Sequence, residues 1–240
     1  KTKKNNIPKR INFKIPRNIS NKPIAIADDK IFHFQYPETK EYLRDIGIQL
    51  VSWNIYEDQE IPEDACSLII PGGFPEKYAE QISCSKNSLK SLRNFYKKGF
   101  IYAECGGMML LGEELSDEKG LTYKMAGILP FKSRKGKLSV GYRFIKGEGD
   151  SLLINKNQEI KGHEFHYWQI EDKIKTSDEK QKLNSEFNFP WKIKSWGTEY
   201  RKEGWSSKNL HASWIHLHLP SNINLIKNLL SNIETSNLKN

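Results

Sequence analysis

Short apolar runs alternate with segments of helical periodicity through the first half of the chain, and this alternation restricts the fold more than any other feature. A strand that is followed by a helix pairs in parallel with the next strand, so the pattern predicts a parallel sheet covered by helices on both faces. The predicted strands are 23–27, 48–53, 67–70 and 100–103, and the predicted helices are 37–47, 75–82, 87–98 and 108–115.

The pattern changes after residue 120, where apolar runs are separated by polar turns. This is typical of antiparallel strands. The polar region 172–190 is expected to be a long surface excursion, and 222–233 has the period of an amphipathic terminal helix. The strands expected in this half are 127–131, 137–145, 163–170 and 211–220. We therefore expect an α/β fold with a mainly parallel central sheet and additional antiparallel strands.

The formal net charge of +9 is concentrated at one end of the chain. Residues 1–27 contain eight Lys or Arg and no Asp or Glu, which leaves 30 basic against 29 acidic residues in the remainder. A nearly neutral body argues against a nucleic-acid partner, because phosphate binding needs a basic surface. The chain starts at Lys1 rather than Met, and residues 1–21 have no helical period. We interpret 1–21 as a basic linker to a missing upstream domain, with a transit peptide as the alternative, and 22–240 as one domain.

Cysteine content and hydropathy indicate the compartment. Three cysteines are too few, and odd in number, for a disulfide framework, which favours a reducing, cytoplasmic setting. No apolar run approaches the ~20 residues that a membrane-spanning helix requires, so we expect no membrane association.

The stretch FIYAECGGMMLLG, residues 100–112, carries the strongest signal for chemistry. A strand that turns sharply into a helix can hold one side chain in a strained, exposed position, and the residues around the turn must then be small. Ala103, Gly106 and Gly107 meet this need around Cys105. The start of the helix favours a thiolate, and the N–H of Gly106 faces a developing oxyanion. Cys105 is thus predicted to be a nucleophile rather than an ordinary buried cysteine.

A second glycine turn follows the predicted strand 67–70. In PGGFPE, residues 71–76, Gly72 and Gly73 allow a backbone N–H to approach a ligand closely. Together with Gly106, this turn is predicted to complete an oxyanion hole.

A cysteine nucleophile needs a base, and histidine is the usual one. Alternation along the predicted strand 211–220 places Trp214, His216 and His218 on one face, which makes either histidine a candidate. A zinc site built from these two together with His163 and His166 is an alternative, but it leaves Cys105 without a role.

Several motifs resemble, in order along the chain, the glutaminase domain of cobyrinic acid a,c-diamide synthases, a family of class I glutamine amidotransferases. They are IADDKIFHFQYPETKEYLRDIG (26–47), PGGFPE (71–76), YAECGGMMLLG (102–112), VGYR (140–143), GHEFHY (162–167) and ASWIHLHLPSN (212–222). The resemblance implies a flavodoxin-like fold for a glutamine amidotransferase domain at 22–240.

The resemblance also implies roles for individual residues. Cys105 matches the nucleophile that forms a glutamyl thioester and releases ammonia, and His216, in preference to His218, matches its base. Gly73 and Gly106 match the oxyanion donors.

One position departs from the wider class, in which a Glu two residues after the histidine orients it. Here that residue is His218. Either a Cys–His dyad suffices or another carboxylate serves, Glu164 first and Glu76 second. His163 and His166 either shape the site or are structural histidines.

The same resemblance defines the expected partners. Glutamine is the substrate of this domain, and no cofactor or metal is expected in it. ATP and Mg²⁺ are expected in the missing amidoligase domain, which would also bind the corrinoid whose a and c carboxylates are amidated. Related glutaminase domains of cobyric acid synthases and of amidases acting on cell-wall precursors are the alternatives. A degenerate binding module is disfavoured because Cys105 and His216 are both present.

Overall fold

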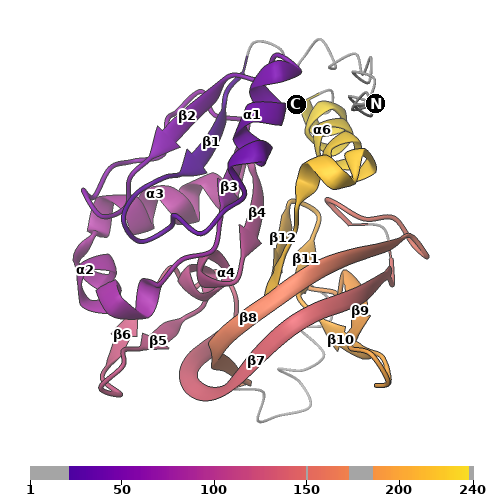
Figure 1. The fold of residues 1–240 in the computed structure, drawn as a ribbon. Helices are drawn as coiled ribbons and strands as arrows, with labels where there is room; N and C mark the ends of the chain where they lie inside the picture. Colours follow the sequence, from indigo (N-terminus) through magenta and orange to yellow (C-terminus); the bar gives the residue numbers. More distant parts are fainter. Residues whose placement is uncertain (1–21, 150, 173–185, 238–240) are drawn as a thin grey trace, which may run out of the picture.

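The computed structural model describes residues 22–149, 151–172 and 186–237 (Figure 1). The predicted linker at 1–21 and most of the predicted excursion at 172–190 lie outside these residues.

Five parallel strands form most of the first sheet, whose order is β11-β12-β4-β3-β1-β2. The parallel strands are β1 (Ile24–Ala27), β2 (Leu50–Trp53), β3 (Ser67–Ile70), β4 (Phe100–Glu104) and β12 (Leu210–Ser213). The edge strand β11 (Trp205–Ser207) pairs antiparallel with β12. The parallel strands therefore follow the order second, first, third, fourth, fifth, which is the flavodoxin-like order. The predicted α/β class is confirmed.

Helices cover both faces of this sheet because the strands bury side chains on both sides (Figure 1). One face packs with α1 (Pro37–Asp45) and α6 (Ile223–Asn237), and its core includes Leu43, Leu225 and Leu229. The other face packs with α3 (Lys86–Tyr96) and α4 (Gly106–Leu111). The short helices η1 (Pro75–Tyr78) and α2 (Ala79–Cys84) replace the single predicted helix at 75–82.

The second sheet is mainly antiparallel and is dominated by the long hairpin of β7 and β8 (Figure 1). Its strands are β5 (Glu114–Ser116), β6 (Thr122–Lys124), β7 (Phe131–Gly147), β8 (Glu159–Asp172), β9 (Trp191–Lys194), β10 (Arg201–Glu203) and β13 (Ile215–His216). The predicted strands at 137–145 and 163–170 are therefore parts of longer strands. The predicted strand at 127–131 is wrong, since only its last residue begins β7.

Two further predictions are wrong. The helix predicted at 108–115 is instead α4, which starts at Gly106 and ends at Leu111, because Gly112 adopts an extended conformation and the chain enters β5. The strand predicted at 211–220 breaks at Trp214: β12 pairs with β4 in the first sheet, and β13 pairs with β8 in the second. The chain thus changes sheets immediately before His216.

No helix in the described part of the chain is long and apolar enough to cross a membrane.

Candidate active site

Cys105 occupies the sharp turn between β4 and α4, with φ 47° and ψ −105°. This left-handed backbone is unusual for a residue with a side chain and costs about 1–3 kcal/mol. Hydrogen bonds on both sides hold it: the Cys105 N–H donates to the Ser213 carbonyl at 2.7 Å, and the Met109 N–H donates to the Cys105 carbonyl at 3.1 Å. The structure therefore contains the predicted elbow, with the thiol at the carboxyl end of the parallel sheet.

Close backbone packing explains the two glycines after Cys105. A Cβ on Gly107 would lie 2.3 Å from the carbonyl oxygen of Ile70 in β3, and one on Gly106 would lie 2.8 Å from the carbonyl oxygen of Gly73. Neither space accommodates a methyl group. The absence of side chains thus lets α4 approach β3 and the glycine turn, which brings Gly106 and Gly73 together beside the thiol.

The turn after β3 forms the opposite wall of the site. The Gly72 carbonyl accepts a hydrogen bond from the Phe34 N–H at 3.0 Å, and a Cβ on Gly72 would lie 2.3 Å from Cε1 of His216. A small cavity of about 20 Å³ opens here, close to the size of one water molecule. Its lining consists of Phe34, Gly73, Phe74, Cys105, Phe165 and His216.

His216 is buried in β13 and lines the small cavity together with Cys105. Burial lowers the pKa of its imidazole, but the hydrogen bonds to Cys105 and Glu104 outweigh burial and raise that pKa to about 10. The surroundings of His216 therefore favour its protonated, imidazolium form. A cation beside a sulfur favours the thiolate, which is the nucleophilic form of cysteine. The thiol also lies 3.5 Å from the carbonyl oxygen of Phe165 in β8.

Glu104 is the carboxylate that contacts His216, and it was absent from the sequence predictions. Its Oε2 lies 3.6 Å from Nδ1 of His216. Its Oε1 accepts hydrogen bonds from the Tyr102 hydroxyl and, at 2.9 Å, from the Leu217 N–H. The available signal was the acidic residue that ends a buried strand directly before Cys105.

Glu164 lies elsewhere, in an ion cluster within the second sheet. Its carboxylate contacts Arg143 in β7 at 2.5 Å, Arg201 in β10 at 2.9 Å and His166 at 2.9 Å. Burial raises the pKa of Glu164, but these partners outweigh burial and hold that pKa at about 2. The carboxylate of Glu164 therefore contacts Arg143, Arg201 and His166. The carboxylate that contacts His216 is that of Glu104.

The remaining candidates occupy the surroundings of the site. His163 is the register partner of His216 across β8 and β13, and its ring lies edge-on to Tyr142. The ring of His166 stacks on Trp214 at 3.9 Å, and that of His218 lies edge-on to Tyr36 at 5.1 Å. The side chains of residues 214, 216 and 218 therefore have different neighbours, as expected once the predicted single strand is broken.

Two other observations separate the alternatives. Glu76 is buried at the start of η1, where burial raises its pKa to about 7. Within the described residues, no group of three or more His, Cys, Asp or Glu side chains is arranged to hold a metal ion. The four histidines of the zinc alternative are thus dispersed among different partners.

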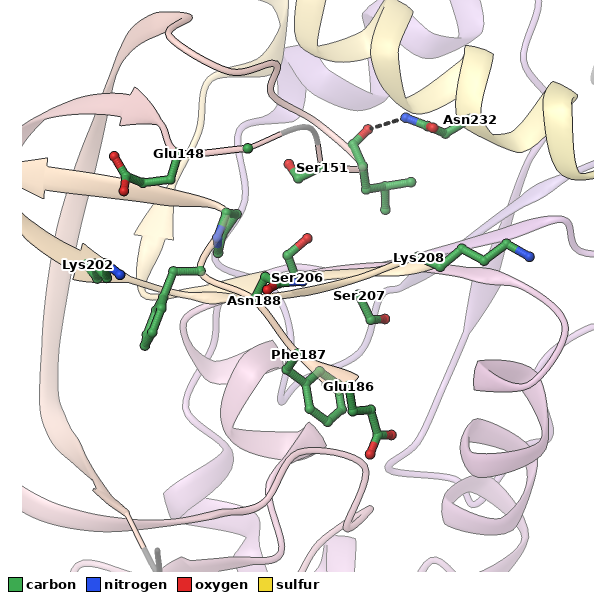
Figure 2. A pocket seen from close by; sticks show the side chains of 14 residues that line it. Glu148, Ser151, Glu186, Phe187, Asn188, Lys202, Ser206, Ser207, Lys208 and Asn232 are labelled. Carbon is green, nitrogen blue, oxygen red and sulfur yellow. Dashed lines mark hydrogen bonds between the residues drawn. The ribbon is translucent and has the colours of Figure 1, made fainter. Parts of the chain in front are cut away.

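A larger cavity lies away from Cys105. It measures about 910 Å³ and is bounded by the end of β7, by β11 and by α6 (Figure 2). Figure 2 shows Ser151, Ser206, Ser207 and Asn232 around it, together with Lys202 and Lys208. Among the described residues that line it there is no cysteine or histidine, so this cavity offers no candidate nucleophile of the Cys105 type.

The fold is that of class I glutamine amidotransferases. PurLQS from Thermotoga maritima covers 90% of this chain, and 99% of its own chain, with a TM-score of 0.56 and 14% identity. A glutamine amidotransferase from the same organism covers 89% of this chain and 84% of its own, with a TM-score of 0.54 and 11% identity. Identities this low show the fold alone.

Sequence similarity identifies the family to which the chain belongs within this fold class. The chain belongs to the CobB/CobQ-like glutamine amidotransferase domain family, which matches residues 23–223. Cobyrinate a,c-diamide synthase of Synechococcus sp. is 34% identical over 213 residues, and that of Picrophilus torridus is 35% identical over 207 residues. These matches cover 88% and 86% of this chain but 44% and 42% of the relatives. The chain thus spans less than half the length of these relatives.

Proposed function

We propose that this domain hydrolyses glutamine through a Cys105 thioester, with His216 as acid and base, and supplies the ammonia for an amidation. The observation that carries the proposal is the strained Cys105 elbow, which lines one small cavity together with the buried His216. Membership of the glutamine amidotransferase family supports the substrate, since the family's shared reaction is transfer of the glutamine amide nitrogen.

The proposed reaction has two balanced steps. In the first, the Cys105 thiolate attacks the side-chain amide carbon of glutamine, His216 gives its proton to the leaving nitrogen, and ammonia departs from a glutamyl thioester. In the second, neutral His216 takes a proton from water, and the hydroxide breaks the thioester to release glutamate and the thiolate. The sum is glutamine plus water giving glutamate plus ammonia.

Backbone N–H groups would stabilise the oxyanion that forms in both steps. Gly73 and Gly106 approach each other beside the thiol, and such donors are typically worth 10²- to 10³-fold in rate. The cavity of about 20 Å³ is too small for the glutamine side chain. Glutamine entry therefore requires movement of Phe34 and Phe165, whose side chains are 44% and 39% exposed.

The proposed acceptor is the a and c carboxylates of cobyrinic or hydrogenobyrinic acid. The similarity to cobyrinate a,c-diamide synthases supports this acceptor. An ATP-dependent amidoligase domain, which binds ATP, Mg²⁺ and the corrinoid, would receive the ammonia. A related amidotransferase, of the cobyric acid synthase type or acting on cell-wall precursors, is the alternative, because the family description covers more than one member type.

Cys105→Ala tests the nucleophile, with Cys84→Ala as the matched control because Cys84 is exposed. We expect Cys105→Ala to abolish glutamate release from glutamine and Cys84→Ala to retain it. In the assembled enzyme, ammonium salts should restore amidation by Cys105→Ala, because the amidoligase then needs no glutamine. Glutamine hydrolysis by Cys105→Ala at the parent rate would disprove the mechanism. Mass analysis of the amidated product identifies the acceptor.

A further inference from the structure

We propose that Glu104 orients and charges His216, that Tyr102 holds Glu104 in place, and that both are therefore positioning residues of the glutaminase reaction. The inference rests on the proposed function. In other class I glutaminases, a Glu two residues after the histidine orients it, and this chain has His218 at that position. We assign the same role to Glu104, the residue before Cys105.

Strand geometry places the two residues together. Tyr102 and Glu104 are two positions apart in β4, so their side chains share one face of the strand. Both are almost completely buried, with 1% and 5% exposure. Burial and the adjacent Glu104 raise the pKa of Tyr102 well above its ordinary value, so its hydroxyl remains a donor. A buried carboxylate is stable only when donors or charges satisfy it, and Tyr102 is one such donor.

The two oxygens of Glu104 have separate tasks. Oε1 accepts from the Tyr102 hydroxyl and from the N–H of Leu217, the residue that follows His216. This leaves Oε2 for His216, at 3.6 Å from Nδ1. The carboxylate is therefore tied to the backbone of the histidine strand and to the imidazole at once. Because Nδ1 faces Glu104, Nε2 is the ring nitrogen left to exchange a proton with the thiol.

The charges around His216 identify Glu104 as its counter-ion. Cys105 and Glu104 approach from the β4–α4 turn, and His163 approaches from β8. The pKa of His163 is lowered by burial, by His216 and by Arg143, so His163 is a neutral neighbour. Glu164, on the same strand, is committed to His166, Arg143 and Arg201.

A second buried carboxylate provides a matched control. Glu203 accepts hydrogen bonds from Nε1 of Trp191 at 2.6 Å, from the Ser213 hydroxyl at 2.8 Å and from the Trp214 N–H at 2.9 Å. It is as buried as Glu104 but holds the β12–β13 junction rather than the imidazole. Replacing Glu104 by glutamine changes a group that contacts His216 itself, whereas replacing Glu203 changes a group that contacts Ser213 and Trp214.

The test compares Glu104→Gln with Glu203→Gln, using glutamine hydrolysis and the pH dependence of Cys105 alkylation by iodoacetamide. Alkylation requires no turnover, so it reports on the site even without a partner domain. We expect Glu104→Gln to lower kcat roughly 100-fold or more while KM changes little, because general acid–base catalysis contributes 10²–10⁴-fold. Its alkylation should begin at higher pH, by about one pH unit, because the imidazolium has lost its counter-ion. Glu203→Gln should keep the parent's pH profile.

Conservative variants keep the test decisive if Glu104→Gln does not fold. Glu104→Asp retains the charge and should retain part of the alkylation shift toward low pH. Tyr102→Phe should lower kcat about tenfold, the effect of one hydrogen bond to a charged group. Its control is Tyr96→Phe, since the hydroxyl of Tyr96 meets Ser207 instead.

The outcomes separate this inference from the proposed function. A parent-like pH profile in Glu104→Gln, or an equal shift in Glu203→Gln, would overturn the role of Glu104. If Cys105→Ala is inactive in the same assays, the proposed function survives that result. If Cys105→Ala hydrolyses glutamine, both fail together.

Discussion

The two sheets hold the site by different physical means. At the end of the first sheet, backbone contacts fix Cys105 so closely that Gly107 has no room for a methyl group. In the second sheet, β8 holds the His216 strand and is itself held by Glu164 among two arginines and a histidine. Contacts of the first kind exclude added atoms whatever the pH, whereas ion pairs depend on charge. Cys105 is thus positioned by steric contacts, and the strand that carries His216 is supported by ion pairs.

The largest effect is expected where the two sheets meet, at Gly72→Ala. The added Cβ would stand 2.3 Å from Cε1 of His216 and push the imidazole away from Cys105. Loss of the base should reduce glutamine hydrolysis about 10³-fold, measured as glutamate release at saturating glutamine.

Gly149→Ala is the control for that change, because its added carbon meets nothing within 4 Å. Gly72→Ala should retain the parent's circular dichroism, since the atom it strikes belongs to a side chain. Parent-like activity in Gly72→Ala would contradict this prediction, because it would show that the imidazole of His216 accommodates the added methyl group without loss of activity.

Glu164→Gln tests whether ion pairs hold β8 in the second sheet. Breaking a buried ion pair leaves two arginines without their shared partner, and we expect the free energy of unfolding to fall by about 3 kcal/mol. The pKa of Glu164 is lowered from 4.5 to about 2. The parent should therefore hold this stabilisation above pH 4.5 and lose it as the pH falls toward 2.

Urea denaturation at several pH values measures both effects. The stability gap between parent and Glu164→Gln should be widest near neutral pH and should close in acid. Glu171→Gln, which breaks the exposed pair with Arg134, should cost less than about 1 kcal/mol. A gap that stays constant with pH would show that packing, and not charge, holds this hairpin.

Gly107→Ala tests whether steric contacts hold α4 against β3. It should lower the free energy of unfolding by less than Glu164→Gln does. Its Cβ would lie 2.3 Å from a backbone oxygen of β3, so α4 must shift outward. Overpacking of this kind costs about 2 kcal/mol. Thermal unfolding should show a lower midpoint at every pH, with Gly149→Ala unchanged. A loss that varied with pH would contradict a purely steric cause.

The sequence predicted those parts of the fold and site that leave local patterns. The parallel strands and their helices follow from apolar period, and Cys105 with its glycines stands out because an elbow needs small residues within a few positions. The break at Trp214 was missed because alternation within 211–220 records which side chains are apolar, and not which sheet each half joins.

Glu104 was missed for a related reason. It ends a buried strand in which four of five residues are apolar, so it resembles an ordinary strand terminus. Its place beside His216 depends on a hydrogen bond from the Leu217 N–H, which lies 113 residues along the chain. Glu164 was favoured because it lies in a histidine-containing motif, but two arginines from other strands occupy its carboxylate.

Because the chain changes sheets before His216, the candidate site depends on both sheets. The thiol belongs to the first sheet and the imidazole to the second, and one residue, Trp214, separates the strands that belong to each. A chain in which only the parallel sheet has formed contains Cys105 but lacks its neighbour His216. The complete constellation of Cys105, Glu104 and His216 therefore exists only when both sheets are formed and packed together.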